Sequence, residues 1–219
     1  MTRDGKNGQR DKLIATKRRW ADEKRLLTGA RGDPDRDRVP PGQTLTSGWP
    51  VLDLGEQPLV TEQSFRLDVV GFVRRPLSLD WAGFLALPQL DSVSDMHCVT
   101  QWSRLDNRWR GVVAAELLAL VEPKDEARHV LLHSHDGYTT NVRLEQFASA
   151  DAMLVHKWNG QPITREHGGP VRVLIPRLYL WKSPKWICRI ELSATDQPGF
   201  WETRGYHNNA DPWGEERYE

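Results

Sequence analysis

Apolar residues alternate with polar ones over much of the chain after residue 41. Between Ser64 and Val73, the side chains of Phe65, Leu67 and Val69 fall on one face of an extended chain, which predicts a strand. Further strands are predicted at 130–132, 138–140, 171–175 and 186–192, and an Asn159-Gly160 turn joins 153–158 to 161–164 as a hairpin. This pattern is typical of a domain rich in antiparallel strands.

Helical spacing is confined to three segments. It predicts a basic helix over 11–27, a short helix that begins at Ser78 as its N-cap, and a helix over 113–121. The short helix has Asp80 in its first turn, and its apolar positions are Trp81, Phe84, Leu85 and Leu87. Strands and helices do not follow one another as βαβ units. We therefore expect an α+β fold with mixed sheets and short helices rather than a doubly wound sheet.

Charge divides the 219 residues into two parts of opposite sign. Residues 1–40 carry 12 Lys/Arg and 7 Asp/Glu, whereas 41–219 carry 18 and 23, although the whole chain has a net charge of +0. Gly and Pro are frequent between 29 and 41, so we expect a basic extension at 1–40 and a single domain at 41–219. A mildly acidic domain does not fit a nucleic-acid binder. No apolar run approaches the roughly 20 residues of a membrane span.

The cysteine content and the N-terminal segment indicate in which cellular compartment the protein is expected. Cys98 and Cys188 are the only two cysteines, too few for a disulfide framework and without the spacing of a zinc or redox motif. Arg18-Arg19 is followed by charged residues rather than by the apolar region of an export signal. We therefore expect a cytoplasmic protein.

The stretch from Asp95 to Ser103 holds the first candidate for chemistry. Its Cys98 is either an inert buried thiol or a thiolate ligand for a soft metal. His97 would point to the opposite face of a strand, so it is a poor base for a cysteine nucleophile. The other histidines, among them His133 and His135, lack the spacing of a zinc site.

Two further stretches combine basic, small and hydroxyl side chains. The first runs from Arg165 through His167-Gly168-Gly169 to Arg172, and the second from Lys182 to Trp186. Alone, each reads as an ordinary turn with solvated charges. Together with a soft ligand at Cys98, they indicate a site for a large polar cofactor that carries a phosphate and a metal.

These stretches resemble the molybdenum-cofactor domain of the sulfite oxidase family. The similarity lies in 97–103, 159–163, 167–176 and 182–186, in the family's order, and extends from about Pro41 to the C-terminus. It is closest to compact prokaryotic sulfite-oxidase-like oxidoreductases, which also resemble the catalytic subunit of the periplasmic methionine sulfoxide reductase. The resemblance implies a sulfite-oxidase-type fold that binds molybdenum-molybdopterin.

The resemblance also implies roles for individual residues. Cys98 would bind molybdenum. Arg104 follows the Cys98 motif closely in the sequence, and it is either a residue that attracts an oxyanion substrate or an exposed arginine. The residues expected to contact the pterin and its phosphate are His167, Arg172, Ser183, Pro184 and Lys185, with Ser134, Leu52 and Asp53 aligned more loosely. Several family members have His at the position of Asp53, so this chain departs from the pattern there.

The resemblance implies a reaction, and two alternatives remain open beside it. It implies a two-electron transfer of an oxygen atom, either oxidation of sulfite or reduction of a small S- or N-oxide. Residues 41–219 leave no room for a haem domain or an immunoglobulin-like dimerisation domain, so a separate redox partner protein is expected. The alternatives are a molybdopterin-binding module with little turnover of its own, and a small zinc or interaction domain.

Overall fold

A computed structural model describes residues 36–55 and 57–219. The helix predicted over 11–27 lies outside these residues. The chain divides into two units, Met1–Val39 and Pro40–Glu219, and in the first the structure describes one 3-10 turn, η1 (Arg36–Arg38). The organisation into an extension at 1–40 and a domain at 41–219 stays a prediction.

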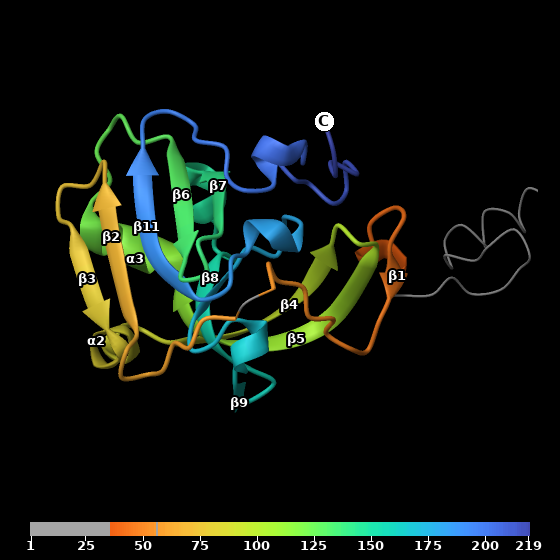
Figure 1. The fold of residues 1–219 in the computed structure, drawn as a ribbon, viewed down its shortest axis with the longest axis horizontal. Helices are drawn as coiled ribbons and strands as arrows, with labels where there is room; N and C mark the ends of the chain where they lie inside the picture. The colour runs from red at the N-terminus through yellow and green to blue at the C-terminus, as the bar shows by residue number, and fades with distance from the viewer. Residues whose placement is uncertain (1–35, 56) are drawn as a thin grey trace, which may run out of the picture. The chain divides into compact units, whose positions relative to one another are not determined.

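One sheet of the second unit has five strands in the order β3-β2-β11-β6-β7 (Figure 1). Its strands are β2 (Arg66–Gly71), β3 (Leu77–Asp80), β6 (His129–Ser134), β7 (Thr139–Arg143) and β11 (Ile187–Ser193). β11 lies between β2 and β6, parallel to β2 and antiparallel to β6. The strands expected from alternation are confirmed here, and β3 is one that the pattern did not indicate.

The other sheet has six strands, with β1-β5-β8-β10 as its path, β4 beside β5 and β9 beside β8. Its strands are β1 (Thr44–Leu45), β4 (Leu90–Cys98), β5 (Trp102–Val113), β8 (Met153–Trp158), β9 (Gln161–Pro162) and β10 (Arg172–Leu174). β4 and β5 form a long hairpin in which Cys98 pairs with Trp102. The tight turn between them places Gln101 at a φ of 68° and fixes Cys98 at the tip of β4. The predicted 153–164 hairpin is confirmed as β8 and β9.

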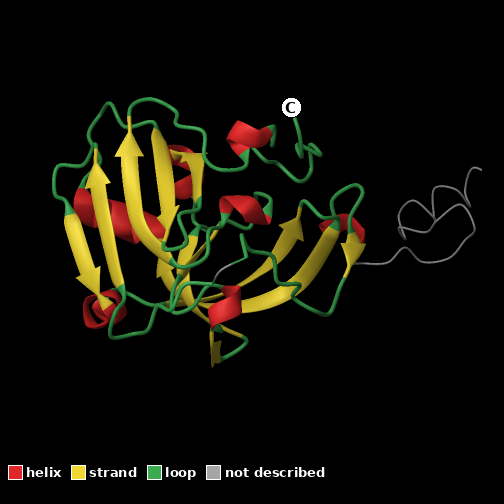
Figure 2. Cartoon of the chain, in the orientation of Figure 1, coloured by secondary structure: helices red, strands yellow, loops and turns green. Residues whose placement is uncertain are grey.

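The helices of residues 36–55 and 57–219 are short (Figure 2), which agrees with the α+β fold expected from the sequence. They are α2 (Trp81–Ala86), α3 (Ala114–Val121), α4 (Leu144–Phe147) and the 3-10 turns η2 (Arg165–His167), η3 (Leu180–Lys182) and η4 (Glu202–Arg204). The predicted N-cap Ser78 is wrong, because β3 continues to Asp80 through its pairing with β2. The Asp80 carboxylate instead caps α2 by accepting a 2.8 Å hydrogen bond from the Gly83 N–H.

The apolar side chains form two main clusters. The larger joins α2 and α3 to the five-stranded sheet through residues such as Phe84, Leu117 and Ile190. The second contains Cys98 and Trp102 and belongs to the six-stranded sheet. In 36–55 and 57–219, no helix is long and apolar enough to cross a membrane.

Gly111 of β5 lies directly against the backbone of β8, at an irregularity in the register of the two strands. A Cβ atom there would lie 2.0 Å from the Leu154 carbonyl oxygen and 2.7 Å from the Val155 Cα. We expect Gly111→Ala to lower the free energy of unfolding by about 2–4 kcal/mol, because backbone atoms must move. Gly48→Ala is the control, since its Cβ would meet only the Thr46 hydroxyl at 3.7 Å. Denaturant unfolding of both variants checks this, and equal losses would contradict it.

Candidate functional site

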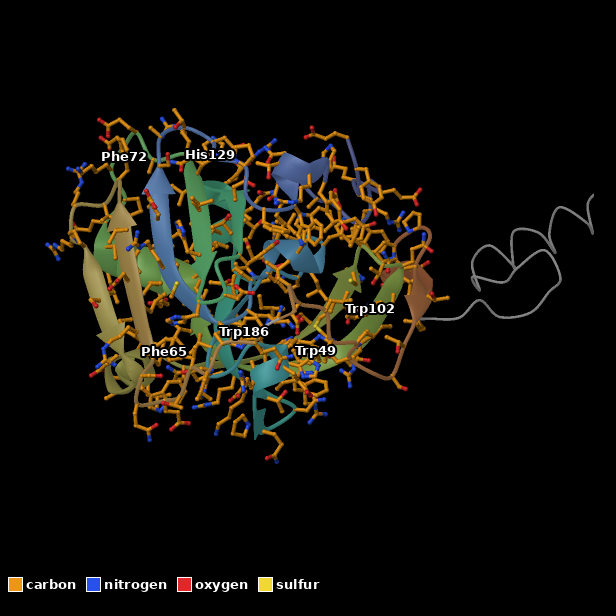
Figure 3. The ribbon with its side chains drawn as sticks, viewed as in Figure 1. Trp49, Phe65, Phe72, Trp102, His129 and Trp186 are labelled. Atoms are coloured by element: carbon orange, nitrogen blue, oxygen red, sulfur yellow. The ribbon has the colours of Figure 1, made fainter. Side chains whose placement is uncertain are left out.

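A cavity of about 390 Å³ is lined by the tip of β4, the turn after β6, the segment from Arg172 to Trp186 and the C-terminal segment. Eight of the residues predicted from the sequence line it, namely Leu52, Asp53, Cys98, Ser134, Arg172, Ser183, Pro184 and Lys185. Tryptophans form much of its wall, among them Trp49, Trp102 and Trp186 (Figure 3). Residues far apart in the sequence therefore line one space, which we call the tryptophan-lined cavity.

Cys98 offers a thiol to this cavity from the end of β4. Its Sγ lies 3.1 Å from the Thr100 hydroxyl oxygen, and burial raises the pKa of the thiol. His97 contributes to a different contact, because its Nδ1 lies 2.8 Å from the Ser103 hydroxyl. The thiol therefore has no adjacent base, which fits a ligand for a soft metal better than a catalytic nucleophile.

Arg172 places a positive charge in the wall of the cavity. Its side chain is 4% exposed and donates hydrogen bonds to the carbonyl oxygens of His167 at 2.9 Å and Ser183 at 2.7 Å. The guanidinium also lies over the Trp49 ring, 5.2 Å from its centroid. Burial lowers the pKa of Arg172 to about 10, so the group remains a cation at neutral pH.

The loop after η3 lies along β10 and presents a second cation. The Ile175 N–H donates to the Ser183 hydroxyl at 2.9 Å, and the Val173 N–H donates to the Pro184 carbonyl at 3.0 Å. Lys185 follows directly and donates to the Glu166 carbonyl at 2.7 Å. Burial, together with the charge of Arg172, lowers the pKa of Lys185 from 10.5 to about 8.

His167 is not a lining residue and lies behind Trp49. The two rings stack with centroids 4.1 Å apart. Nε2 lies 3.0 Å from the Trp49 carbonyl oxygen, so this nitrogen carries the proton, and Nδ1 accepts from the Thr164 hydroxyl at 2.9 Å. His167 therefore supports Trp49 through its ring and Arg172 through its carbonyl. Direct contact with a cofactor stays a prediction for this residue.

The loosely aligned residues have different surroundings. Leu52 and Asp53 come from an exposed loop, in which hydrogen bonds from Gln57 and Gly55 lower the pKa of the Asp53 carboxyl. Arg104 does not line the cavity, because it bonds to the Ser47 carbonyl and Asn107 and lies over Trp158 at 4.6 Å. Its role in attracting an oxyanion stays a prediction.

Aromatic residues of the C-terminal segment form a wall that the sequence reasoning missed. Trp201 and Tyr206 line the cavity and stack with centroids 4.8 Å apart, and Tyr206 meets Trp181 edge-on at 5.0 Å. Burial raises the pKa of the Tyr206 hydroxyl, which keeps it protonated. The density of aromatic residues after Phe200 is the signal that could have indicated this wall.

Two buried polar atoms of the wall have no hydrogen-bond partner in the described structure. They are the Trp102 Nε1 and the Ser134 Oγ. Leaving such a group unpaired costs about 1–3 kcal/mol. A polar ligand in the cavity would remove this cost by forming hydrogen bonds with both atoms. Thiol, cations and unpaired polar atoms together match a ligand with a soft metal, an anionic group and a polar ring.

Comparison with known proteins agrees with this donor set. The sequence model of the family described as "Oxidoreductase molybdopterin binding domain" matches residues 54–201. The chain is 43% identical over 83% of its length to "Uncharacterized oxidoreductase YuiH" of Bacillus subtilis, of which it covers 92%. It is 30% identical over 68% of its length to "Putative protein-methionine-sulfoxide reductase subunit YedZ1" of Azospira oryzae, of which it covers 56%.

More distant matches show the same fold. A "Sulfite oxidase" of Arabidopsis thaliana is 27% identical over 76% of the chain, which spans 53% of that protein. The sulfane dehydrogenase SoxCD from Paracoccus pantotrophus superposes with a TM-score of 0.59 at 21% identity, over 64% of this chain and 40% of that one. The sulfite-oxidase-type fold expected from the sequence is confirmed. The chain belongs to the oxidoreductase molybdopterin-binding domain family, to which the sulfite oxidases also belong, and is a molybdopterin-dependent oxidoreductase.

Proposed function

We propose that this oxidoreductase transfers an oxygen atom between water and a small substrate, with Cys98 as the protein ligand of molybdenum. The observation that carries the proposal is the meeting of a buried thiol with two cations, Arg172 and Lys185, in one cavity. Molybdopterin, when bound, supplies the two-electron redox chemistry. The protein supplies binding, orientation and a wall that excludes water.

The chain's own residues have separable roles in this proposal. Arg172 and Lys185 would bind the cofactor's phosphate, because each offers N–H donors and positive charge. Ser183, Pro184, Ser134 and Trp102 would contact the pterin. Tyr206 keeps its phenolic proton and can donate a hydrogen bond from the aromatic wall. Leu52 and Asp53 lie on the exposed loop at the cavity's edge.

The names of the relatives support two substrate classes. Sulfite oxidation adds one oxygen from water and releases two electrons and two protons. Reduction of an S- or N-oxide consumes two electrons and two protons and releases the oxygen as water. One relative is named a sulfite oxidase, and others are named protein-methionine-sulfoxide reductase. A separate redox partner protein would accept or supply the electrons. We also propose a cytoplasmic location, which fractionation of cells that express the chain tests.

Replacing the proposed metal ligand tests the function directly. We expect Cys98→Ser to lower turnover by at least about 100-fold and to reduce molybdenum content, because a hydroxyl is a harder and weaker ligand. The assays are sulfite with a dye acceptor, a sulfoxide with a reduced dye donor, and molybdenum and pterin analysis of the purified protein.

The matched control is Cys188→Ser. Cys188 lies in β11, where its thiol donates to the His133 carbonyl, and it does not line the cavity. This variant should retain metal and turnover. Full molybdenum and unchanged activity in Cys98→Ser would refute the proposed ligand. Bound pterin without turnover in the unmodified protein would indicate a binding module, and protein without pterin would refute both.

Alkylation distinguishes the two thiols without an activity assay. Burial raises the pKa of Cys98 and of Cys188, so each is mostly the neutral thiol at pH 7. In the cofactor-free protein, both should react slowly with iodoacetamide and faster as the pH rises beyond 9. Loading the cofactor should protect Cys98 and leave Cys188 unchanged, as mass spectrometry of the peptides would show. Equal labelling of Cys98 in both states would contradict metal ligation.

The lowered pKa of Lys185 predicts a pH dependence of anion binding. A lysine with a pKa of about 8 is charged below that pH and neutral above it. Affinity of the cofactor-free protein for sulfate, a phosphate analogue that does not titrate in this range, should fall by about tenfold between pH 7 and 9. In Lys185→Arg the affinity should stay level, since guanidinium does not deprotonate there, and in Lys185→Gln it should be low throughout. Calorimetric titration measures this, and an equal fall in Lys185→Arg would exclude Lys185 as the cause.

A further inference from the structure

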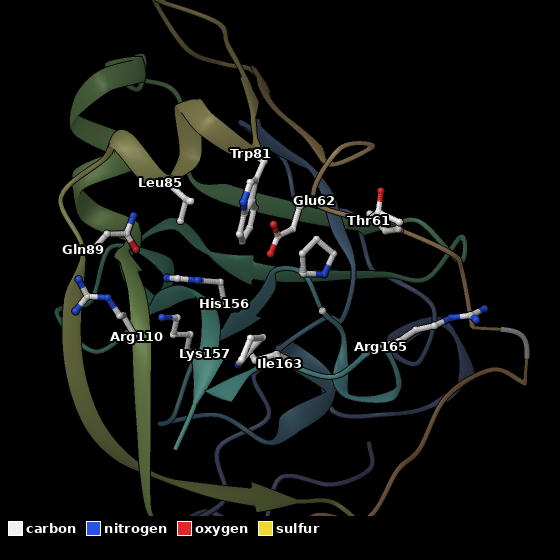
Figure 4. A pocket seen from close by; sticks show the side chains of 14 residues that line it. Thr61, Glu62, Trp81, Leu85, Gln89, Arg110, His156, Lys157, Ile163 and Arg165 are labelled. Atoms are coloured by element: carbon white, nitrogen blue, oxygen red, sulfur yellow. The ribbon is translucent and has the colours of Figure 1, made fainter. Parts of the chain in front are cut away.

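A second cleft, of about 710 Å³, lies between α2, the β8–β9 hairpin and the segment before β2 (Figure 4). Trp81 and Leu85 of α2 face it, together with His156 and Lys157 of β8. It shares no lining residue with the tryptophan-lined cavity. We call it the α2 cleft, and the proposed oxygen-atom transfer assigns nothing to it.

Two buried polar atoms belonging to side chains of the α2 cleft have no hydrogen-bond partner among the described residues. They are the Nε2 of His156 and the Oε1 of Gln89. The His156 side chain is held in place, with the residue 7% exposed and its ring edge-on to Trp81 and Phe84 at 5.7 and 6.0 Å. The imidazole Nε2 donates or accepts according to its tautomer, whereas the amide oxygen only accepts, and a ligand in the cleft could pair with both.

Basic side chains outnumber carboxylates in the lining of the α2 cleft. Arg110, Lys157 and Arg165 line the cleft, against one carboxylate, Glu62. Arg110 is paired with Asp91 at 2.6 Å, and Arg165 donates to the Pro58 carbonyl. Lys157 forms no ion pair in 36–55 and 57–219, so its charge is available to an anion.

His156 contributes hydrogen bonding and no charge. Burial, with the nearby charges of Lys157 and Arg110, lowers its pKa from 6.5 to about 4 although Asp91 opposes this. The imidazole is therefore neutral at physiological pH. The attraction for an anion rests on the Lys and Arg side chains.

The remaining wall is apolar and includes a flat aromatic surface. Trp81, Leu85, Pro162, Ile163 and Pro170 line it. An inorganic anion would leave this surface in contact with water, whereas an anion with an aromatic ring would cover it. The wall therefore favours an organic ligand over a simple ion.

We propose that the α2 cleft binds a small aromatic carboxylate that carries a hydroxyl group. Lys157 pairs with the carboxylate, Trp81 contacts the ring, and His156 and Gln89 exchange hydrogen bonds with the polar groups. Occupancy of this site is independent of the redox reaction, so the proposal stands or fails separately from the proposed function.

The test uses the full chain loaded with its cofactor, so that the tryptophan-lined cavity is filled. 4-Hydroxybenzoate is titrated while NMR follows the indole N–H of Trp81, assigned with Trp81→Phe. We expect saturable shifts, and binding of the neutral 4-hydroxybenzamide at least about tenfold weaker, since it lacks the charge. Benzoate, which lacks the hydroxyl donor, should also bind more weakly.

Charge variants locate the site. Lys157→Gln should lower the affinity for 4-hydroxybenzoate about three- to tenfold and leave the affinity for the amide unchanged. Glu62→Gln should raise the affinity for 4-hydroxybenzoate. Lys124→Gln, a surface lysine that lines neither cavity, is the matched control. No saturation at about 10 mM, equal affinity for acid and amide, or equal effects of Lys157→Gln and Lys124→Gln would overturn the proposal. His156→Gln should lower the affinity for both the acid and the amide. If this variant does not fold, Lys157→Gln, Glu62→Gln and Lys124→Gln decide the outcome.

Discussion

The buried guanidinium of Arg172 is the interaction on which the tryptophan-lined cavity depends. It joins His167 before β10 to Ser183 after η3 through their carbonyl oxygens, and it lies over Trp49 from the segment before β2. Trp49 is more than a hundred residues from His167 and Ser183 in the sequence, and all three segments meet at this one cation. Among the described residues, no carboxylate lies within ion-pair distance of it, and carbonyl oxygens carry only partial charge. A buried cation with incomplete compensation is unfavourable in an empty site, so the same group that assembles the cavity also makes it a site for an anion.

A buried ion pair lies beside two residues that line the cavity, because Lys182 follows Trp181 and Glu202 follows Trp201 in the sequence. Lys182 and Glu202 form an ion pair of 2.7 Å with almost no exposed side-chain surface, and Lys182 also donates to the Asn141 carbonyl at 2.8 Å. Glu202 accepts from the Trp181 indole at 3.1 Å, so the pair connects η3 to η4 and to the aromatic residues beside them. Removing either partner would leave an uncompensated charge. The position of Trp201 and Tyr206 therefore depends on Lys182, although Lys182 does not line the cavity.

Sequence patterns predicted most strands because their causes are local. Alternation in β2 and the Asn-Gly turn after β8 act within a few residues, and the structure has both. Ser78 failed as an N-cap because the pairing of β3 with β2, a contact between strands, extends the strand to Asp80. The cavity's lining could be anticipated where motifs mark it, as at Cys98 and 183–185. Trp49 and Tyr206 were not predicted as lining residues, because their positions depend on stacking and on buried charges contributed by distant segments.

The distribution of unpaired polar atoms connects the two cavities. In the described part of the chain, seven buried side-chain nitrogen or oxygen atoms have no hydrogen-bond partner, and four of them belong to residues that line one of these two spaces. Trp102 and Ser134 belong to the tryptophan-lined cavity, and Gln89 and His156 to the α2 cleft. Folding normally pairs such groups, because each unpaired one costs about 1–3 kcal/mol. Their concentration beside cations, with an aromatic surface in each cavity, is the arrangement expected where a polar, anionic ligand completes the hydrogen bonding that the chain leaves open.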